Sequence, residues 1–153
     1  MTGRSPFQTT PISPVIGAEV SGLDLSRPLE PRVIETLHSA LASHLVLFFR
    51  DQPLTQEQHI AFGRRFGNLH IHPAAPKDAE FPEILVVHAD DKVSFVAGSV
   101  WHSDVSCDIE PPLGSILRME QVPSVGGDTL FANMYAAFEA LSPPMQQLLS
   151  GLT

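Results

Sequence analysis

Cysteine, tryptophan and tyrosine each occur once in the 153 residues. With a single thiol, at Cys107, the chain cannot build an internal disulfide framework, which is typical of a protein from a reducing compartment. We therefore expect a cytoplasmic protein. The cysteine itself has two interpretations: a buried inert thiol, or a thiol exposed to oxidation beside a reactive site.

Long hydrophobic runs and basic residues are also scarce. The longest apolar run, 45–49, is far shorter than the roughly 20 residues that a membrane-spanning helix needs. Residues 1–14 are polar and proline-rich, so we predict no secretory signal. Nine basic residues face seventeen acidic ones, and the net charge of −8 argues against a nucleic-acid or anionic-membrane partner.

Proline, by contrast, is abundant. The chain has fourteen prolines, of which thirteen fall at plausible element edges, and this argues against a helix bundle. Apolar spacing and capping signals predict helices at 31–41, 56–66, 135–141 and 142–149. Short β-rich runs predict strands at 15–20, 45–49, 84–88, 101–105, 115–120 and 129–132, with a polar loop at 90–100. The length suits one domain.

The segment Val100–Val105 contains a histidine and an aspartate two residues apart. In an extended chain, His102 and Asp104 would project from the same edge, because side chains alternate between faces. One imidazole and one carboxylate are two of the three ligands in the two-His-one-carboxylate facial triad of non-haem Fe(II) oxygenases. A surface histidine beside a solvated aspartate is the plain alternative.

The neighbourhood of this pair resembles the taurine dioxygenase (TauD/TfdA) family of Fe(II)- and 2-oxoglutarate-dependent dioxygenases. The resemblance follows the order of the chain and rests on 16–22, 48–52, 65–73, 101–106, 110–117, 122–131 and 135–141. It implies a mixed α/β fold with a mainly β core, a double-stranded β-helix (jelly roll) with flanking helices. The family continues well past the position of Thr153, so we expect residues 1–153 to be the N-terminal part of a single dioxygenase domain, truncated and inactive alone.

The resemblance also implies roles for particular residues. His102 and Asp104 would bind Fe(II), and Thr129 would contact 2-oxoglutarate, the co-substrate that is oxidised with O2. His72 would contact the acidic head group of a small-molecule substrate, and Val105 would line its pocket. The plain alternatives are a satisfied strand hydroxyl for Thr129 and a loop histidine bonded to backbone for His72.

Two departures from taurine-specific relatives affect the expected substrate. Gly98 stands where they have asparagine, and Ala75 stands where they have an aromatic hydroxyl. Two polar contacts to a sulphonate are therefore missing, and another small acid, such as another sulphonate, an alkyl sulphate or an aryloxy acid, is as plausible as taurine. The second ligating histidine and the arginine that pairs with 2-oxoglutarate cannot be assigned, because no histidine follows Thr129 and the last arginine is Arg118.

Two other hypotheses remain open from the sequence. The chain could be a non-catalytic remnant that serves as an interaction or oligomerisation module, and a homo-oligomer is compatible with the enzyme as well. Alternatively, a different cupin-like metalloenzyme could complete its site with His70, His72 or His88.

Overall fold

The computed structural model describes residues 5–76, 78–89 and 98–152, which form three strands and four helices. The chain divides into two compact units. The sheet unit takes Met1–Asp24, Leu29–Gln52 and Gln121–Thr153, and the loop unit takes Leu25–Pro28 and Pro53–Glu120. In chain order the elements are β1 (Gln8–Pro11), β2 (Ala18–Ser21), α1 (Pro31–His44), β3 (Leu47–Phe49), α2 (Gln56–Gly63), α3 (Met134–Glu139) and α4 (Pro143–Ser150).

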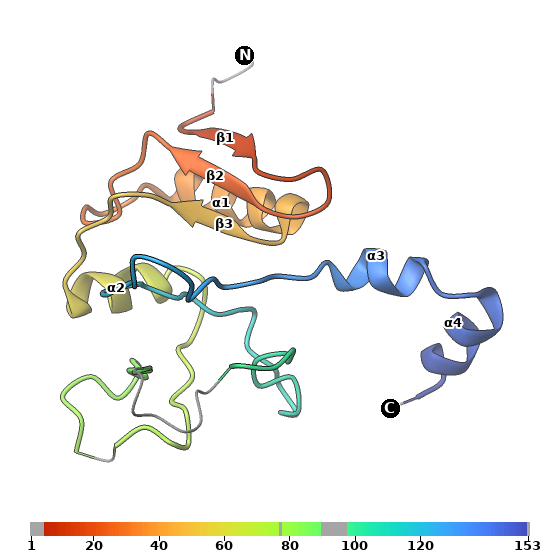
Figure 1. The fold of residues 1–153 in the computed structure, drawn as a ribbon. Coiled ribbons are helices and arrows are strands. Elements are labelled where there is room, and N and C mark those ends of the chain that lie inside the picture. Colours follow the sequence, from red (N-terminus) through yellow and green to blue (C-terminus); the bar gives the residue numbers. More distant parts are fainter. Residues whose placement is uncertain (1–4, 77, 90–97, 153) are drawn as a thin grey trace. The chain divides into compact units, whose positions relative to one another are not determined.

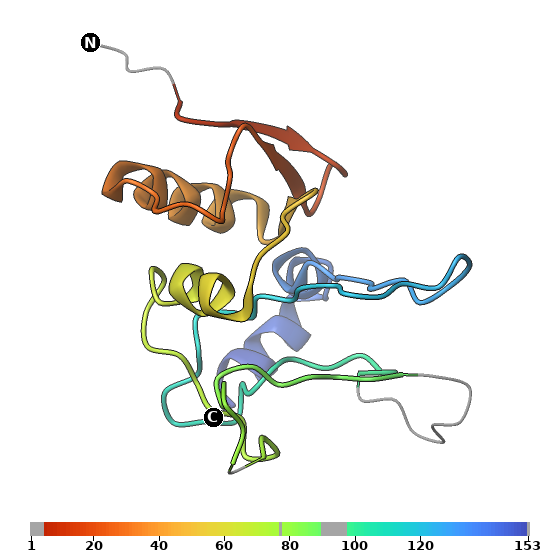
Figure 2. The same cartoon turned by 90° about the vertical axis from the view of Figure 1, so that its left-hand side faces the viewer.

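The sheet unit is built on a three-stranded sheet in the order β1-β2-β3 (Figure 1). Strand β1 pairs antiparallel with β2, and β3 pairs parallel with β2, with Ala18 opposite Leu47. A parallel pair needs a crossover connection, and α1 supplies it along one face of the sheet (Figures 1 and 2). The core between helix and sheet consists of apolar residues from both: Phe7, Ala18, Val20, Val33, Ile34 and Leu37.

Helix α1 agrees with the prediction, because Pro31 occupies its first position and its apolar residues recur every three to four positions. The helix ends where Leu45 takes a left-handed conformation, with φ 67°. The carbonyl of His44 then accepts the Gly17 N–H at 2.8 Å, which ties the end of α1 to the start of β2. Gly17 has φ 89°, and a Cβ there would lie 3.3 Å from Phe48, so the position requires glycine.

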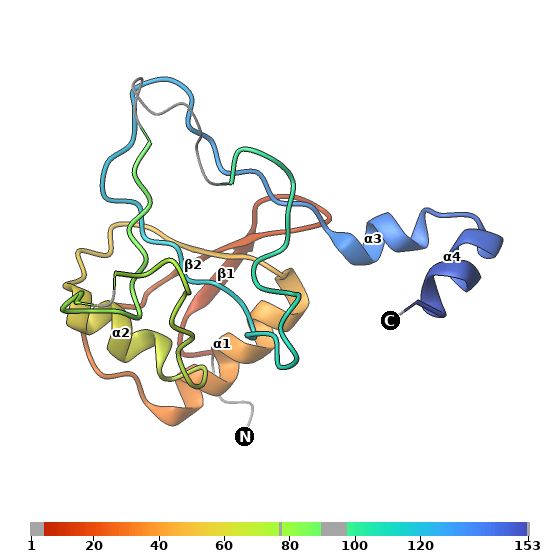
Figure 3. The same ribbon diagram turned by 90° about the horizontal axis from the view of Figure 1, so that it is seen from below.

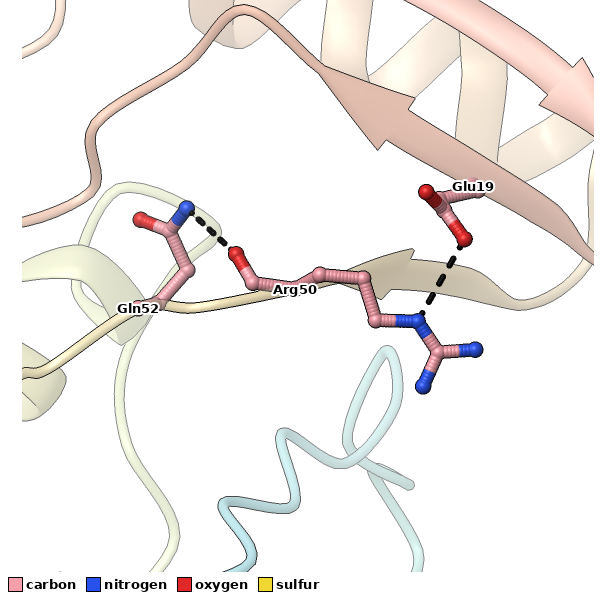
Figure 4. A network of polar contacts seen from close by, with 3 residues as sticks. All are labelled: Glu19, Arg50 and Gln52. Carbon is pink, nitrogen blue, oxygen red and sulfur yellow. Dashed lines mark hydrogen bonds and ion pairs between the residues drawn. The ribbon is translucent and has the colours of Figure 1, made fainter.

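An ion pair joins two strands at the surface of the sheet unit. Arg50 follows β3, and its Nε lies 3.3 Å from Oε2 of Glu19 on β2 (Figure 4). The Gln52 side-chain amide donates to the Arg50 carbonyl at 3.0 Å and to the Leu23 carbonyl at 3.2 Å. Both charged groups of the ion pair are largely exposed, so the contact adds little stability.

Helix α2 in the loop unit begins with the predicted capping box. The N–H of Gln58 donates to the Thr55 hydroxyl at 3.3 Å, and the Gln58 side chain accepts the Thr55 N–H at 2.8 Å. The amide of Gln58 also donates to the Ser26 carbonyl at 3.1 Å, which joins the two pieces of the unit. The helix ends at Gly63 instead of Phe66, because the N–H groups of residues 65 and 66 bond three residues back and tighten the last turn.

Strands β2 and β3 are shorter than predicted, and β1 was not predicted. The expected helices near the C-terminus are confirmed as α3, capped by the Asn133 side chain, and α4, which begins at Pro143 (Figure 3). The expected strands at 84–88, 101–105, 115–120 and 129–132 do not form in the described residues. A strand needs a hydrogen-bonding neighbour, and the described ladders join only β1, β2 and β3.

The mixed α/β character is therefore confirmed, whereas the jelly roll is not seen in the described residues. The predicted loop at 90–100 falls mostly on residues 90–97, which lie outside the described ranges. Among the helices that the structure describes, α1 is the longest at 14 residues, and none has the length and apolarity needed to cross a membrane.

Candidate metal centre

His102 and Asp104 lie face to face in the loop unit. Nε2 of His102 is 3.2 Å from Oδ1 of Asp104, and about half of each side chain is exposed (50% and 54%). The structure therefore brings this imidazole and this carboxylate together, as the spacing predicted.

The strand predicted at 101–105, which would carry both residues, does not form. Asp104 begins a bend that continues into a turn at Ser106 and Cys107. Val105 has φ 50°, a left-handed conformation that β-branched residues rarely adopt, and its carbonyl accepts the Asp108 N–H at 3.2 Å. The pair stands at the start of a tight turn, so individual hydrogen bonds hold it in place instead of a β-ladder.

The outer atoms of both side chains are also bonded. Nδ1 of His102 lies 2.8 Å from the carbonyl oxygen of Val100, and the Ser115 hydroxyl donates to Oδ2 of Asp104 at 2.6 Å. Because a carbonyl only accepts, Nδ1 must carry a proton, and in neutral imidazole this leaves the lone pair on Nε2. The Nε2 lone pair and the carboxylate oxygen then face the same space.

Two facing lone pairs suit a shared cation. Imidazole nitrogen and carboxylate oxygen bind a divalent metal such as zinc at about 2.0–2.2 Å, so two ligands at right angles lie about 3 Å apart. The observed 3.2 Å between Nε2 and Oδ1 agrees with this separation. These two residues therefore fit a metal ion as adjacent ligands. Within residues 5–76, 78–89 and 98–152, no group of three or more His, Cys, Asp or Glu could hold the ion.

His70 and His72 do not join this pair in the described contacts. Nε2 of His70 lies 3.4 Å from Oδ2 of Asp108. Nδ1 of His72 accepts the Ala74 N–H at 3.1 Å, so in the neutral ring the proton is on Nε2. The backbone contact proposed as the plain alternative is present, and it leaves His72 with a donor that can meet an acidic group.

Thr129 belongs to the sheet unit and is exposed. Both glycines before it have a left-handed backbone: Gly126 has φ 77° and Gly127 has φ 74°. A Cβ at Gly127 would lie 3.0 Å from Cγ of Pro123, so the backbone conformation and the close contact both require glycine there.

The chain just after Thr129 is anchored within the sheet unit. The Phe131 ring packs edge-to-face on Phe48, with centroids 6.0 Å apart. The Asn133 side-chain amide donates to the Val15 carbonyl at 2.7 Å, across 118 residues of sequence. These contacts set the position of residues 131–133 against the sheet, and local sequence patterns do not predict them.

Two further positions lie near His102 and Asp104 in the sequence. Gly98 has φ 86°, and a Cβ there would lie 3.4 Å from Cε1 of His102. An asparagine at this position would therefore have a strained backbone close to a candidate ligand.

Cys107 is exposed, so the interpretation as a buried inert thiol is wrong. Its turn directs the side chain to solvent, because no described segment covers it.

His59 on α2 is the histidine with a clear pKa shift. Partial burial lowers the pKa of His59 below its ordinary value, the hydrogen bond with the Ile116 backbone raises it, and the Arg118 charge lowers it again. Helix α2 is thus in contact with the segment around Ile116, which directly follows Ser115.

Sequence reasoning did not find Ser115 or Asp108. Each contacts a histidine or carboxylate that was singled out, but the Ser115 contact spans 11 residues of irregular chain and the Asp108 contact spans 38. No periodic pattern predicts a contact across such a loop, so only the folded chain reveals these two residues.

Comparison with known proteins gives a consistent match. Residues 8–153 match the family described as "Taurine catabolism dioxygenase TauD, TfdA family". The 2,4-dichlorophenoxyacetate dioxygenase of Cupriavidus pinatubonensis, named as α-ketoglutarate-dependent, is 35% identical over 93% of this chain and 55% of its own. The α-ketoglutarate-dependent sulfonate dioxygenase of Saccharomyces cerevisiae is 33% identical over 92% of this chain and 37% of its own.

A solved structure agrees with these relatives. The crystal structure of a taurine dioxygenase from Burkholderia xenovorans is 38% identical and superposes with a TM-score of 0.78, over 95% of this chain and 51% of its own. The chain thus spans about half the length of the proteins it matches.

Proposed function

Since the chain belongs to the TauD/TfdA dioxygenase family, as its match over residues 8–153 shows, we propose that the protein is an Fe(II)- and 2-oxoglutarate-dependent dioxygenase. Its reaction would hydroxylate a small organic acid and release succinate and CO2. The observation that carries the proposal is the 3.2 Å approach of His102 Nε2 to Asp104 Oδ1.

In this proposal His102 and Asp104 hold the metal as adjacent ligands. Bound Fe(II) would couple the oxidative decarboxylation of 2-oxoglutarate by O2 to hydroxylation of the substrate. The protein's task is to orient the reactants and exclude water. The Val100 carbonyl keeps the proton of His102 on Nδ1, so that Nε2 stays available to the metal.

Three further residues have roles in binding. We assign the Thr129 hydroxyl to 2-oxoglutarate, by its place after Gly126 and Gly127, which both have a positive φ. The N–H at Nε2 of His72 would donate to the acidic head group of the substrate, since Nδ1 already accepts the Ala74 N–H. Val105 would line the substrate pocket, because it directly follows Asp104.

The substrate class follows from the chemistry of these positions. A single imidazole donor suits a carboxylate, sulphonate or sulphate ester, and Gly98 and Ala75 offer no side-chain donor. The relatives named above act on an aryloxy acid and on sulfonates. We therefore propose an aryloxy acid, an alkyl sulphate or a sulphonate other than taurine.

We further propose that residues 1–153 are the N-terminal part of one dioxygenase domain with a jelly-roll core, in a cytoplasmic protein. Two observations support the proposal of a partial domain: the chain spans about half of its relatives, and the β-rich segments after residue 84 are largely exposed without pairing among the described residues. The remaining family ligands, a histidine and an arginine, would then lie in the part of the relatives that this chain does not cover.

The proposed function is tested by succinate formation. The full-length protein, supplied with Fe(II), 2-oxoglutarate and a panel of aryloxy acids, alkyl sulphates and sulphonates, should produce succinate with at least one substrate. Asp104→Ala should reduce turnover by about a hundred-fold or more, because the variant lacks an anionic ligand.

Asp108→Ala is the matched control. This carboxylate lies on the same loop and also pairs with a histidine, at 3.4 Å, so the variant removes equal charge from the same turn. It should retain most of the activity. If Asp104→Ala stays active, or if Asp108→Ala is the inactive variant, the metal assignment is wrong.

A further inference from the structure

The carboxylate of Asp104 is held by two different contacts, one on each oxygen. Oδ1 faces Nε2 of His102 at 3.2 Å, and Oδ2 accepts the Ser115 hydroxyl at 2.6 Å. The second bond has the length usual for a hydroxyl donating to a charged oxygen, about 2.5–2.7 Å, which is shorter than a bond between neutral groups. The two oxygens are therefore already distinguished in the folded chain.

A carboxylate can bind a metal through one oxygen or through both. Binding through both oxygens would use an additional coordination position. A facial triad works only while the positions opposite its three ligands stay open, because the co-substrate and oxygen bind there. A hydrogen bond that occupies the outer oxygen opposes chelation through both.

We propose that Ser115 is a positioning residue that keeps Asp104 bound to the metal through Oδ1 alone, and that it thereby preserves the coordination position needed for 2-oxoglutarate. This inference rests on the proposed function. Ser115 does not touch the reactants, and it acts only through the Asp104 carboxylate.

The placement of Ser115 supports this role. The segment after it contacts α2, because the Ile116 backbone bonds with the His59 ring and the Cδ1 atom of Ile116 lies 3.7 Å from the position of a Cβ at Gly63. The serine is therefore carried by chain that packs on a helix, whereas Asp104 lies at the start of an exposed turn. Around metal sites, a residue whose backbone is held by packing commonly fixes the orientation of a ligand on a more exposed segment.

The test separates metal binding from co-substrate binding. Fe(II) and then 2-oxoglutarate are titrated anaerobically into the full-length protein by calorimetry, without turnover. For Ser115→Ala we expect 2-oxoglutarate to bind about ten-fold more weakly, with a smaller change in Fe(II) affinity, since the freed oxygen can join the metal. Ser115→Thr keeps the hydroxyl and should restore 2-oxoglutarate binding to within about two-fold of the parent.

Ser106→Ala is the control, because this serine lies on the turn two residues after Asp104. It should bind both ligands like the parent protein. Unchanged 2-oxoglutarate affinity in Ser115→Ala would overturn the proposal, and so would an equal loss of Fe(II) and 2-oxoglutarate affinity, which indicates general disruption. If the parent protein itself binds neither ligand, the proposed function fails and this inference fails with it. If the parent protein binds both Fe(II) and 2-oxoglutarate and Ser115→Ala binds them equally well, only the inference about Ser115 is refuted.

Discussion

The residues up to Gly63 and those after it differ sharply in burial, although both stretches are rich in apolar side chains. All ten buried apolar residues of the described chain lie between Phe7 and Phe62. Beyond Gly63 no described residue is buried, and Ile109 and Val125 are almost fully exposed. An apolar pattern therefore produces a core only where a second surface is present to cover it, as α1 covers the sheet.

The residues up to Gly63 and those after it also differ in the interactions that fix their backbone. In the first part, packing and a ladder fix the backbone. In the second, the candidate metal pair depends on single hydrogen bonds from Val100 and Ser115. A site held in this way can form without a core of its own, but its geometry is sensitive to the loss of any one bond.

The largest expected effect concerns the core itself. Leu37 on α1 is completely buried (0% exposed), so Leu37→Ala should lower the free energy of unfolding of this 153-residue chain by about 2–5 kcal/mol. Leu117→Ala is the matched change in the second part, where the side chain is 64% exposed, and should cost less than about 0.5 kcal/mol. Urea unfolding measures both, and equal losses would contradict the contrast in burial.

A smaller effect is expected from the backbone. Gly17→Ala places a Cβ on a left-handed residue, 3.3 Å from Phe48, and should destabilise the chain by about 1–2 kcal/mol. At Gly114 an added Cβ meets no atom within 4 Å, so Gly114→Ala should be close to neutral. Thermal unfolding compares the two variants. A neutral Gly17→Ala would show that the sheet tolerates movement at its edge.

The smallest effect is a pH dependence at His59, where α2 meets the segment around Ile116. Burial lowers the pKa of His59 from 6.5 in the folded state, so the unfolded chain takes up the proton first as the solution is acidified. The resulting loss of folding stability is absent above about pH 6.5 and grows as the pH falls below that value. Unfolding midpoints at a series of pH values should fall less steeply on acidification in His59→Gln. If the unfolding midpoints of the parent and of His59→Gln fall equally steeply with pH, the burial of His59 against the segment around Ile116 is refuted.

Some parts of the fold and site could be predicted from short-range patterns. Pro31 with its periodic apolar residues determines α1, and Thr55 with Gln58 determines the start of α2, because these signals act within a few residues. The approach of His102 to Asp104 is also local. The strand predicted to hold the pair does not form, since Val105, directly after it, has a left-handed backbone.

The strands predicted after residue 84 show the limit of such patterns. Alternating apolar residues there predict strands as clearly as those of β2, but a ladder requires a neighbour, and β2 has two. Exposed Cys107 is a second example, since burial depends on a covering surface and not on the residue type.

Residue order alone was enough for the family, the choice of His102 and Asp104 as metal-binding candidates, helix α1 from Pro31 and the capping box of α2. Folding in three dimensions was required to bring Ser115 to the outer oxygen of Asp104, Asp108 to His70, and Asn133 to the Val15 carbonyl. The reason is distance along the chain. Capping and turn formation act between residues a few positions apart, whereas these contacts join residues 11 to 118 positions apart, which only the packed structure makes neighbours.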